Sequence, residues 1–208
     1  MPTTTLEQEI RATTPWRYIA GVDEAGRGAI AGPVVAAAVI LPLDDPPRLA
    51  ALTGVNDSKQ LTAGQRERLY ELILTHALAY GIGRTPAAQI DTLGIWPATM
   101  QAMRQAVGQL HPAGEFLLID GRQALRQVSL PQRTVIRGDS LSLSIAAASI
   151  LAKVSRDREM VVLDAQYPQY GFARHKGYCT RDHEAALATH PPCPVHRYSF
   201  APIRPGLL

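Results

Sequence analysis

Residues 18–41 read YIAGVDEAGRGAIAGPVVAAAVIL, and they give the first indication of the fold. Two short apolar runs, 18–22 and 34–41, flank a segment that contains the turn-forming residues Gly26, Gly28 and Gly32-Pro33. Apolar runs of strand length between turn residues are typical of strands in a buried sheet. The stretch therefore predicts two neighbouring strands.

The chain after residue 41 alternates between helical and strand patterns. A helix is expected from near Thr62, because Leu69, Leu72, Ile73 and His76 fall on one face. Thr85-Pro86 is typical of a helix start, with Thr85 as the N-cap. Further helices are expected over 95–110 and about 140–164, and further strands over 77–83, 116–119 and 134–136. Strands that alternate with helices indicate a layered α/β domain.

Length and composition indicate one folded unit. The chain has 208 residues, of which 46% are hydrophobic and 19% charged, as in an ordinary globular protein. We expect a core over 1–166 and a C-terminal appendage over 167–208 that is rich in proline, histidine and basic residues. Two cysteines in a chain of this length do not form a disulfide framework.

Charge and hydropathy narrow the range of partners. The net charge is only +3, so binding to nucleic acid would require local clusters of basic residues. The polar N-terminus lacks the apolar segment of a signal peptide, and no apolar run reaches the roughly 18 residues of a membrane span. The sequence predicts a cytoplasmic protein that does not bind membranes.

Acidic residues stand where predicted strands end. Asp23-Glu24 closes the first strand, Asp120 closes the strand over 116–119, and Asp139 precedes the last long helix. In an open α/β sheet such positions meet at the crevice beyond the strand ends. Several converging carboxylates can bind a pair of Mg²⁺ ions that promote phosphodiester hydrolysis. Asp157 cannot share an ion with Asp139, because it lies about 27 Å further along the predicted helix.

Each acid also has a structural explanation. Asp23-Glu24 is equally compatible with a solvated pair, since neighbours on a regular strand point to opposite faces. Asp120 before Gly121 is typical of a turn, and Asp139 is typical of a helix cap. The acids alone therefore leave both interpretations open.

The sequence resembles the type 2 ribonucleases H, the ribonuclease HII family. The resemblance covers residues 18 to about 202 and rests on these blocks: GVDEAGRG at 21–28, AGPVVAAAV at 31–39, NDSK at 56–59, LIDG at 118–121, GDS at 138–140, SIAAASILAKV at 144–154, YGF at 170–172 and HKGY at 175–178. It implies a ribonuclease H-like α/β fold, in which helices flank a mixed five-stranded sheet, and a helical C-terminal extension.

The resemblance also implies roles for individual residues. The metal-binding carboxylates of the family match Asp23, Glu24, Asp120 and Asp139. Gly26, Arg27 and Gly28 match the segment that reads the ribonucleotide 2′-hydroxyl, the group that distinguishes RNA from DNA. Tyr178 matches the tyrosine that packs on the adjoining deoxyribose.

The implied activity is that of a two-metal endonuclease, with Mg²⁺ or Mn²⁺ as cofactor. It would cut on the 5′ side of ribonucleotides in RNA/DNA hybrids and of single ribonucleotides in duplex DNA, leaving a 3′-hydroxyl and a 5′-phosphate. We expect it to act as a monomer. Removal of misincorporated ribonucleotides and of RNA primers would be its biological role.

Basic residues are the expected phosphate contacts. Lys59 belongs to the matched NDSK block, and Arg27 is expected near the scissile position. The C-terminal candidates are Arg174, His175, Lys176 and Arg181. A tetrahedral zinc site built from Cys179, His183, Cys193 and His196 is an alternative, although Cys-Cys pairs usually lead such motifs.

The chain departs from the family pattern at two positions. Ala29 replaces a proline that is frequent after the Gly-Arg-Gly turn, so the loop is expected to be less rigid. Leu141 replaces a frequent lysine or arginine after Gly-Asp-Ser, so substrate affinity or its salt dependence is expected to differ. Neither change affects a carboxylate.

Other classes of protein remain as alternatives. A type 3 ribonuclease H commonly has Gly-Lys-Gly and an added N-terminal module, whereas this chain has Arg27. A junction resolvase shares the carboxylate chemistry but does not predict the combination of Gly-Arg-Gly with Tyr178. A non-catalytic hybrid-binding module would be expected to lose an acid, and all four acids are present.

Overall fold

A mixed five-stranded sheet in the order β3-β2-β1-β4-β5 forms the centre of the computed structural model, which describes residues 1–203. β1, β2 and β3 are antiparallel neighbours, whereas β4 and β5 run parallel to β1. The strands are β1 (Ile19–Ala25), β2 (Val34–Ile40), β3 (Ala79–Thr85), β4 (Phe116–Asp120) and β5 (Gln132–Val135). All five predicted strands are confirmed, with small shifts at their ends.

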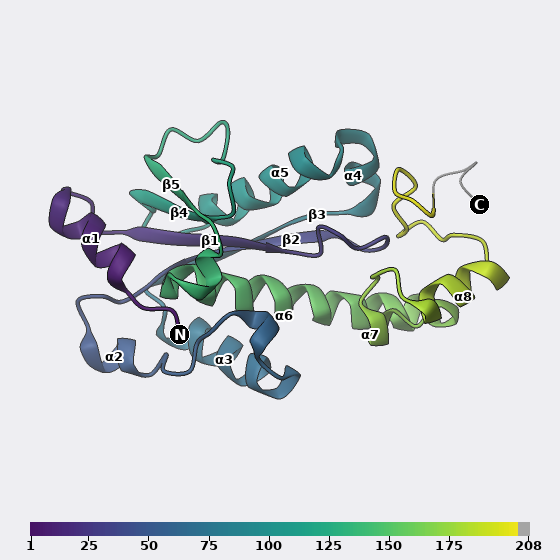
Figure 1. Cartoon of the computed structure of the whole chain (residues 1–208), viewed down its shortest axis with the longest axis horizontal. Helices are drawn as coiled ribbons and strands as arrows, with labels where there is room; N and C mark the ends of the chain where they lie inside the picture. Colours follow the sequence, from purple (N-terminus) through teal and green to yellow (C-terminus); the bar gives the residue numbers. More distant parts are fainter. Residues whose placement is uncertain (204–208) are drawn as a thin grey trace.

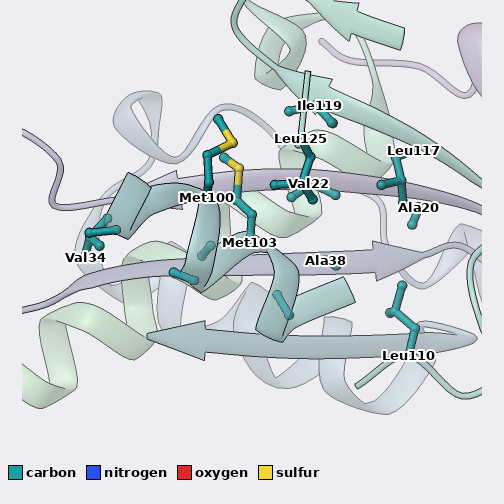
Figure 2. Packing of buried hydrophobic residues seen from close by; sticks show 14 of the residues in the cluster. Ala20, Val22, Val34, Ala38, Met100, Met103, Leu110, Leu117, Ile119 and Leu125 are labelled. Carbon is teal, nitrogen blue, oxygen red and sulfur yellow. The ribbon is translucent and has the colours of Figure 1, made fainter. Parts of the chain in front are cut away.

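Helices cover both faces of the sheet, as Figure 1 shows. One face is covered by α4 (Ala87–Leu93) and α5 (Ile95–Gly108), the other by α3 (Ala63–His76) and α6 (Leu143–Gln166). Figure 2 shows Met100 and Met103 of α5 above Val22 of β1 and Ala38 of β2. The central strands are therefore buried on both sides, which explains why β2 is a continuous apolar run instead of an alternating one.

Two predicted helix starts differ from the observed ones. α6 begins at Leu143, and its N-cap is Ser142, whose hydroxyl accepts a hydrogen bond from the Ile145 amide. The interpretation of Asp139 as a helix cap is therefore wrong. Thr85 is not an N-cap either, because it ends β3 and donates its hydroxyl proton to the Ala98 carbonyl. The start of α3 is confirmed, with Thr62 as its cap.

Short helices complete the chain. The sequence patterns did not predict α1 (Thr5–Thr13) or α2 (Pro46–Ala50). The buried Glu7 of α1 accepts hydrogen bonds from Ser142 and Ser144, which fixes α1 to the start of α6. No helix within residues 1–203 is long and apolar enough to cross a membrane.

The C-terminal appendage packs beside the end of α6. It contains α7 (Phe172–His175) and α8 (Arg181–Thr189), and its apolar cluster joins Tyr170 and Phe172 to Met160 of α6 and to Ala31. This contact places the appendage next to the loop between β1 and β2. The predicted division into 1–166 and 167–208 stays a prediction, and residues 204–208 lie outside the described part.

Candidate active site

The four predicted acids gather at one edge of the sheet. β1 and β4 are parallel neighbours whose last paired residues are Val22 and Ile119. Asp23 and Asp120 come directly afterwards, and Glu24 follows Asp23. Asp139 lies in a short 3₁₀ turn, Gly138–Ser140, which is tied to β4 because the Gly138 amide donates a 2.7 Å hydrogen bond to Asp120 Oδ1.

The acids are crowded and partly removed from water. Burial raises the pKa of Asp23 well above its ordinary value, and the charges of Glu24 and Asp120 raise it further. Burial also raises the pKa values of Glu24 and Asp120, against the opposing effects of Arg27 on Glu24 and of the Gly138 amide on Asp120. Carboxylates therefore crowd at this edge, and a bound cation would relieve their repulsion.

Two protein cations contact the acids. Lys59 Nζ lies 3.1 Å from Asp139 Oδ2, and Arg27 Nη1 lies 2.9 Å from Glu24 Oε1. Although burial lowers it, the pKa of Lys59 is raised overall by its hydrogen bond to Asp139. A short 3₁₀ helix, Ser58–Gln60, holds Lys59 in place, because the Asp57 side chain accepts the Lys59 amide proton.

The acids fit a divalent cation by their chemistry. All are oxygen donors, as hard ions such as Mg²⁺ and Mn²⁺ prefer. Within residues 1–203 no three His, Cys, Asp or Glu side chains converge on one point as metal ligands do. Three of the carboxylates instead accept hydrogen bonds from protein groups, namely Lys59, Arg27 and the Gly138 amide. A divalent cation would replace these partners.

An open cleft of about 1040 Å³ lies over this edge, and we name it the acidic cleft. Asp23, Glu24 and Asp120 line it, together with Lys59 and Tyr178. The Gly26-Arg27-Gly28 turn forms another wall, and the remaining lining residues include Trp96, Arg122, Gln123 and Lys153. The predicted substrate-binding residues other than Lys176 thus share one cleft with three of the acids.

Gly26 adopts a backbone conformation that favours glycine. Its φ is +87°, and an added Cβ would lie 1.8 Å from Nε of Arg156. A Cβ at Gly28 would meet nothing within 4 Å, so the bare backbone there faces open space in the cleft. The turn can therefore approach a sugar closely from the Gly28 side.

Two buried arginines brace this turn from below. Arg197 donates to the carbonyls of Gly26 at 2.7 Å, Arg27 at 2.9 Å and Gly32 at 3.0 Å. Arg156 donates to the carbonyls of Ala31 and Pro33. Neither guanidinium is paired with a carboxylate within the described chain, and burial together with the charge of Arg156 lowers the pKa of Arg197 to about 9.

Loss of the Arg197 brace is expected to destabilise the protein. Arg197→Ala leaves three loop carbonyls without their donor, so we expect the free energy of unfolding to fall by about 3 kcal/mol. Chemical denaturation measures this change. Arg68→Ala is the matched control, because Arg68 is exposed on α3. An equal denaturation midpoint for Arg197→Ala and wild type would contradict the stabilising role of Arg197.

Neither buried arginine was predicted to matter, although one signal was available. Arg156 lies four residues from both Ala152 and Met160 on α6, and all three side chains are buried. A charged residue on an apolar helix face rarely becomes buried unless it has a specific hydrogen-bonding task. The sequence offered no comparable periodic signal for Arg197 or for Trp96.

Tyr178 lies at the rim of the acidic cleft with its side chain partly exposed. The guanidinium of Arg156 stands 5.3 Å from the centre of its ring, and Lys153 Nζ stands 6.0 Å from it. These cations hold the ring from one side and are attracted to its π face. The exposed remainder of the ring is available for a substrate.

The predicted phosphate contacts of the appendage lie elsewhere. Lys176 stays a predicted substrate contact: its Nζ donates a hydrogen bond to the Ala173 carbonyl at 2.6 Å, and its side chain does not line the acidic cleft. Arg174 pairs with Asp182, and the buried His175 bonds the Tyr170 carbonyl. None of these side chains, nor Arg181, lines the acidic cleft.

The four residues of the alternative zinc site do not lie together. Cys179 is exposed and contacts Glu184. Cys193 is buried beside His196, whose other ring nitrogen lies 3.1 Å from Nε2 of His183. Burial and the neighbouring His183 lower the pKa of His196 to about 4. This cluster packs around Phe172 and Tyr170 in the appendage core.

Acid is expected to weaken the appendage through His196. Because its folded pKa lies below the ordinary value of 6.5, the unfolded chain binds the proton first as the pH falls. The contribution of neutral His196 to the free energy of unfolding is complete near pH 7 and declines towards pH 4. About 2 kcal/mol of it is lost at pH 5. Urea unfolding of wild type and His196→Gln should show a stability difference that shrinks from pH 7 to pH 5. A difference independent of pH would contradict this expectation.

The mixed sheet, its two helical layers and the acidic cleft at the strand ends together define a nuclease of the ribonuclease H-like class. The family model described as Ribonuclease HII matches residues 20–203. The chain therefore belongs to the ribonuclease HII family. Its activity is that of a type 2 ribonuclease H, an endonuclease that hydrolyses RNA in RNA/DNA hybrids.

Sequence relatives match almost the whole chain. A Ribonuclease HII from Chloroflexus aurantiacus is 52% identical over 208 residues, which cover 100% of this chain and 97% of the relative. A Ribonuclease HII from Geobacter sp. (strain M21) is 57% identical over 189 residues, which cover 91% of this chain and 80% of the relative. The similarity therefore spans both the core and the appendage.

Solved structures confirm the ribonuclease H-like fold. The ribonuclease H2 of Pyrococcus horikoshii superposes with a TM-score of 0.76 at 26% identity, covering 90% of this chain and 96% of that one. The RNase HII in the PCNA:RNase HII complex from Archaeoglobus fulgidus has a TM-score of 0.69 at 27% identity, covering 83% and 88%. These structures agree with the family that the family model and the sequence relatives show.

Proposed function

We propose that Asp23, Glu24, Asp120 and Asp139 bind two divalent cations, Mg²⁺ or Mn²⁺, and that the chain cuts on the 5′ side of ribonucleotides. When bound, such ions would activate the attacking water and stabilise the leaving oxygen. The observation that carries the proposal is the crowding of these acids at one edge, where burial and mutual repulsion raise the pKa of Asp23. A ribonuclease HIII of the same fold has been solved in complex with Mn²⁺.

The Gly26-Arg27-Gly28 turn is proposed to read the 2′-hydroxyl. Its backbone borders the acidic cleft next to Glu24, and the open space at Gly28 admits a sugar. Tyr178, on the same cleft, would pack on the adjoining deoxyribose. A turn that recognises the 2′-hydroxyl and a ring that prefers a deoxyribose together select the junction between RNA and DNA.

Lys59 and Arg27 are proposed to contact substrate phosphates. The Lys59 side chain is 77% exposed although its ammonium group lies beside Asp139. Arg27 is 52% exposed and lies beside Glu24. Once the carboxylates hold divalent cations, both side chains are free to neutralise the phosphodiester. Lys176 remains a proposed substrate contact outside the acidic cleft.

The proposed substrates are RNA/DNA hybrids and duplex DNA that contains single ribonucleotides. The proposed products carry a 3′-hydroxyl and a 5′-phosphate. The biological role would be removal of misincorporated ribonucleotides and RNA primers by a cytoplasmic monomer. The proposed choice of substrate rests on the combination of the glycine turn with Tyr178 in one cleft.

A DNA duplex with one ribonucleotide tests the proposal. Pure protein with Mg²⁺ or Mn²⁺ should nick this duplex on the 5′ side of the ribonucleotide, and ligation of the nick would identify the 3′-hydroxyl and 5′-phosphate ends. The same duplex with a deoxyribonucleotide at that position is the control and should stay intact. A non-catalytic hybrid-binding module would bind without nicking. Nicking of the all-DNA duplex would contradict the role of the 2′-hydroxyl.

A further inference from the structure

A second hollow adjoins the acidic cleft on the side of α5. It has a volume of about 490 Å³, and we name it the side groove. Trp96 and Gln123 line both the side groove and the acidic cleft, so the two hollows adjoin each other at these residues. The far wall of the side groove is formed by Arg104, Arg126 and Gln127.

The side groove is basic, in contrast to the acidic cleft. Residues 121–138 contain four arginines and no acid, and α5 contains Arg104 and no acid. Among the described residues, no acidic side chain lines the side groove. Within residues 1–203, neither Arg104 nor Arg126 forms a salt bridge, while Arg104 Nη1 lies 3.5 Å from the carbonyl oxygen of Arg126. Both guanidinium groups are therefore available to an anionic ligand.

Trp96 stands where the two hollows meet. Its ring lies under the guanidinium of Arg27, which is 5.3 Å from the ring centre, and Arg27 itself borders the acidic cleft. A nucleic-acid strand alternates anionic phosphates with apolar sugar faces. An aromatic ring between arginines matches this alternation, because the ring can pack on a sugar while the arginines contact the flanking phosphates.

We propose that the side groove carries the sugar-phosphate backbone of the substrate duplex away from the acidic cleft, over Trp96 and onto Arg104 and Arg126. This inference rests on the proposed function and extends it beyond the scissile site. An acidic peptide would also be attracted by the arginines. The position of the side groove directly beside the acidic cleft favours nucleic acid, because a bound duplex must leave that cleft along one of its open sides.

The double variant Arg104→Ala/Arg126→Ala tests the proposal by duplex binding. Fluorescence anisotropy with Ca²⁺ in place of Mg²⁺ would measure the Kd for duplexes with one central ribonucleotide. For a duplex with long flanks on both sides, we expect the Kd to rise about tenfold, and the slope of log K against log salt to fall by about 2.

Flank length gives the decisive comparison. The side groove leaves the acidic cleft in one direction, so shortening one flank until it ends within the acidic cleft should abolish the difference between the double variant and wild type. Shortening the other flank should leave the difference unchanged. For Trp96→Ala, the difference in duplex affinity from wild type should likewise depend on the length of that one flank.

Matched controls separate this binding surface from a general loss of charge. Arg17→Ala/Arg68→Ala removes two exposed charges, one before the start of β1 and one on α3 across the sheet. This control should bind every duplex as wild type does, and equal melting temperatures would establish that all variants fold.

Several outcomes would overturn the proposal. The proposal would be overturned by a double variant that binds the long duplex as tightly as wild type does. A loss of duplex affinity that does not depend on flank length would overturn it as well. A double variant that loses affinity only for an acidic peptide would indicate the other occupant. Wild-type protein that fails to nick would instead overturn the proposed function, so the two failures are distinguishable.

Discussion

Asp139→Asn should abolish nicking of a duplex that contains one ribonucleotide. The substitution keeps the shape of the side chain but removes one carboxylate charge from a group of four. The proposed cations would supply several kcal/mol of transition-state stabilisation, so we expect the rate to fall by about a thousandfold. Single-turnover cleavage at saturating protein measures the change.

The variant should fail in catalysis and not in folding. Asp139 contributes to the repulsion that raises the pKa of Asp23, so its neutralisation relieves charge crowding and should not lower the melting temperature. Asp182→Asn is the matched control, because Asp182 is exposed on α8 and pairs only with the exposed Arg174. Cleavage by Asp139→Asn at the rate of Asp182→Asn would remove Asp139 from the catalytic group.

Gly21→Ala should unfold or severely destabilise the protein. An added Cβ would lie 2.2 Å from the backbone carbonyl carbon of Ser144 and 2.3 Å from the amide of Ile145, at the first turn of α6. Because backbone atoms cannot rotate aside, β1 and α6 would have to separate. We expect a loss of about 3 kcal/mol or more in the free energy of unfolding.

Thermal and urea unfolding of Gly21→Ala would measure this loss. Gly64→Ala is the matched control, because a Cβ at Gly64 meets nothing within 4 Å and alanine favours the α3 helix. The control should be as stable as wild type or slightly more stable. A Gly21→Ala protein with the stability of wild type would mean that β1 and α6 do not approach as closely as described.

The elements of the sheet were predictable because their patterns are local. Residues 34–41 form a continuous apolar run since β2 is covered by helices on both faces, and this pattern alone indicates a buried strand. The helix α3 was likewise predicted from its start near Thr62 and from its apolar spacing, and a helix over 95–110 was expected where α5 lies. The helices α1 and α2 were missed because they are short, and the burial of Glu7 in α1 depends on Ser142 and Ser144 more than 130 positions away.

The sequence predicted which residues lie near one another in the candidate site, but not which contacts their side chains make. The spacing of strands placed Asp23 and Asp120 at the same edge, and the resemblance to a family added Gly28 and Tyr178. The side-chain partners could not be predicted, because Lys59 reaches Asp139 across 80 positions of sequence. Lys176 was predicted as a substrate contact from a sequence block alone, and its side chain turns back to Ala173.

The class of fold, the strand that carries Asp23 and Glu24, and the family could be predicted from the sequence alone. Strand length, turn residues and motif blocks are properties of consecutive residues. The tertiary structure alone decided how the acids are held, since burial and charge crowding arise only where distant segments meet. It also decided that Arg156 and Arg197 lie beneath the Gly26 turn and that the side groove joins the acidic cleft at Trp96. Packing between distant segments, and not local propensity, creates these features.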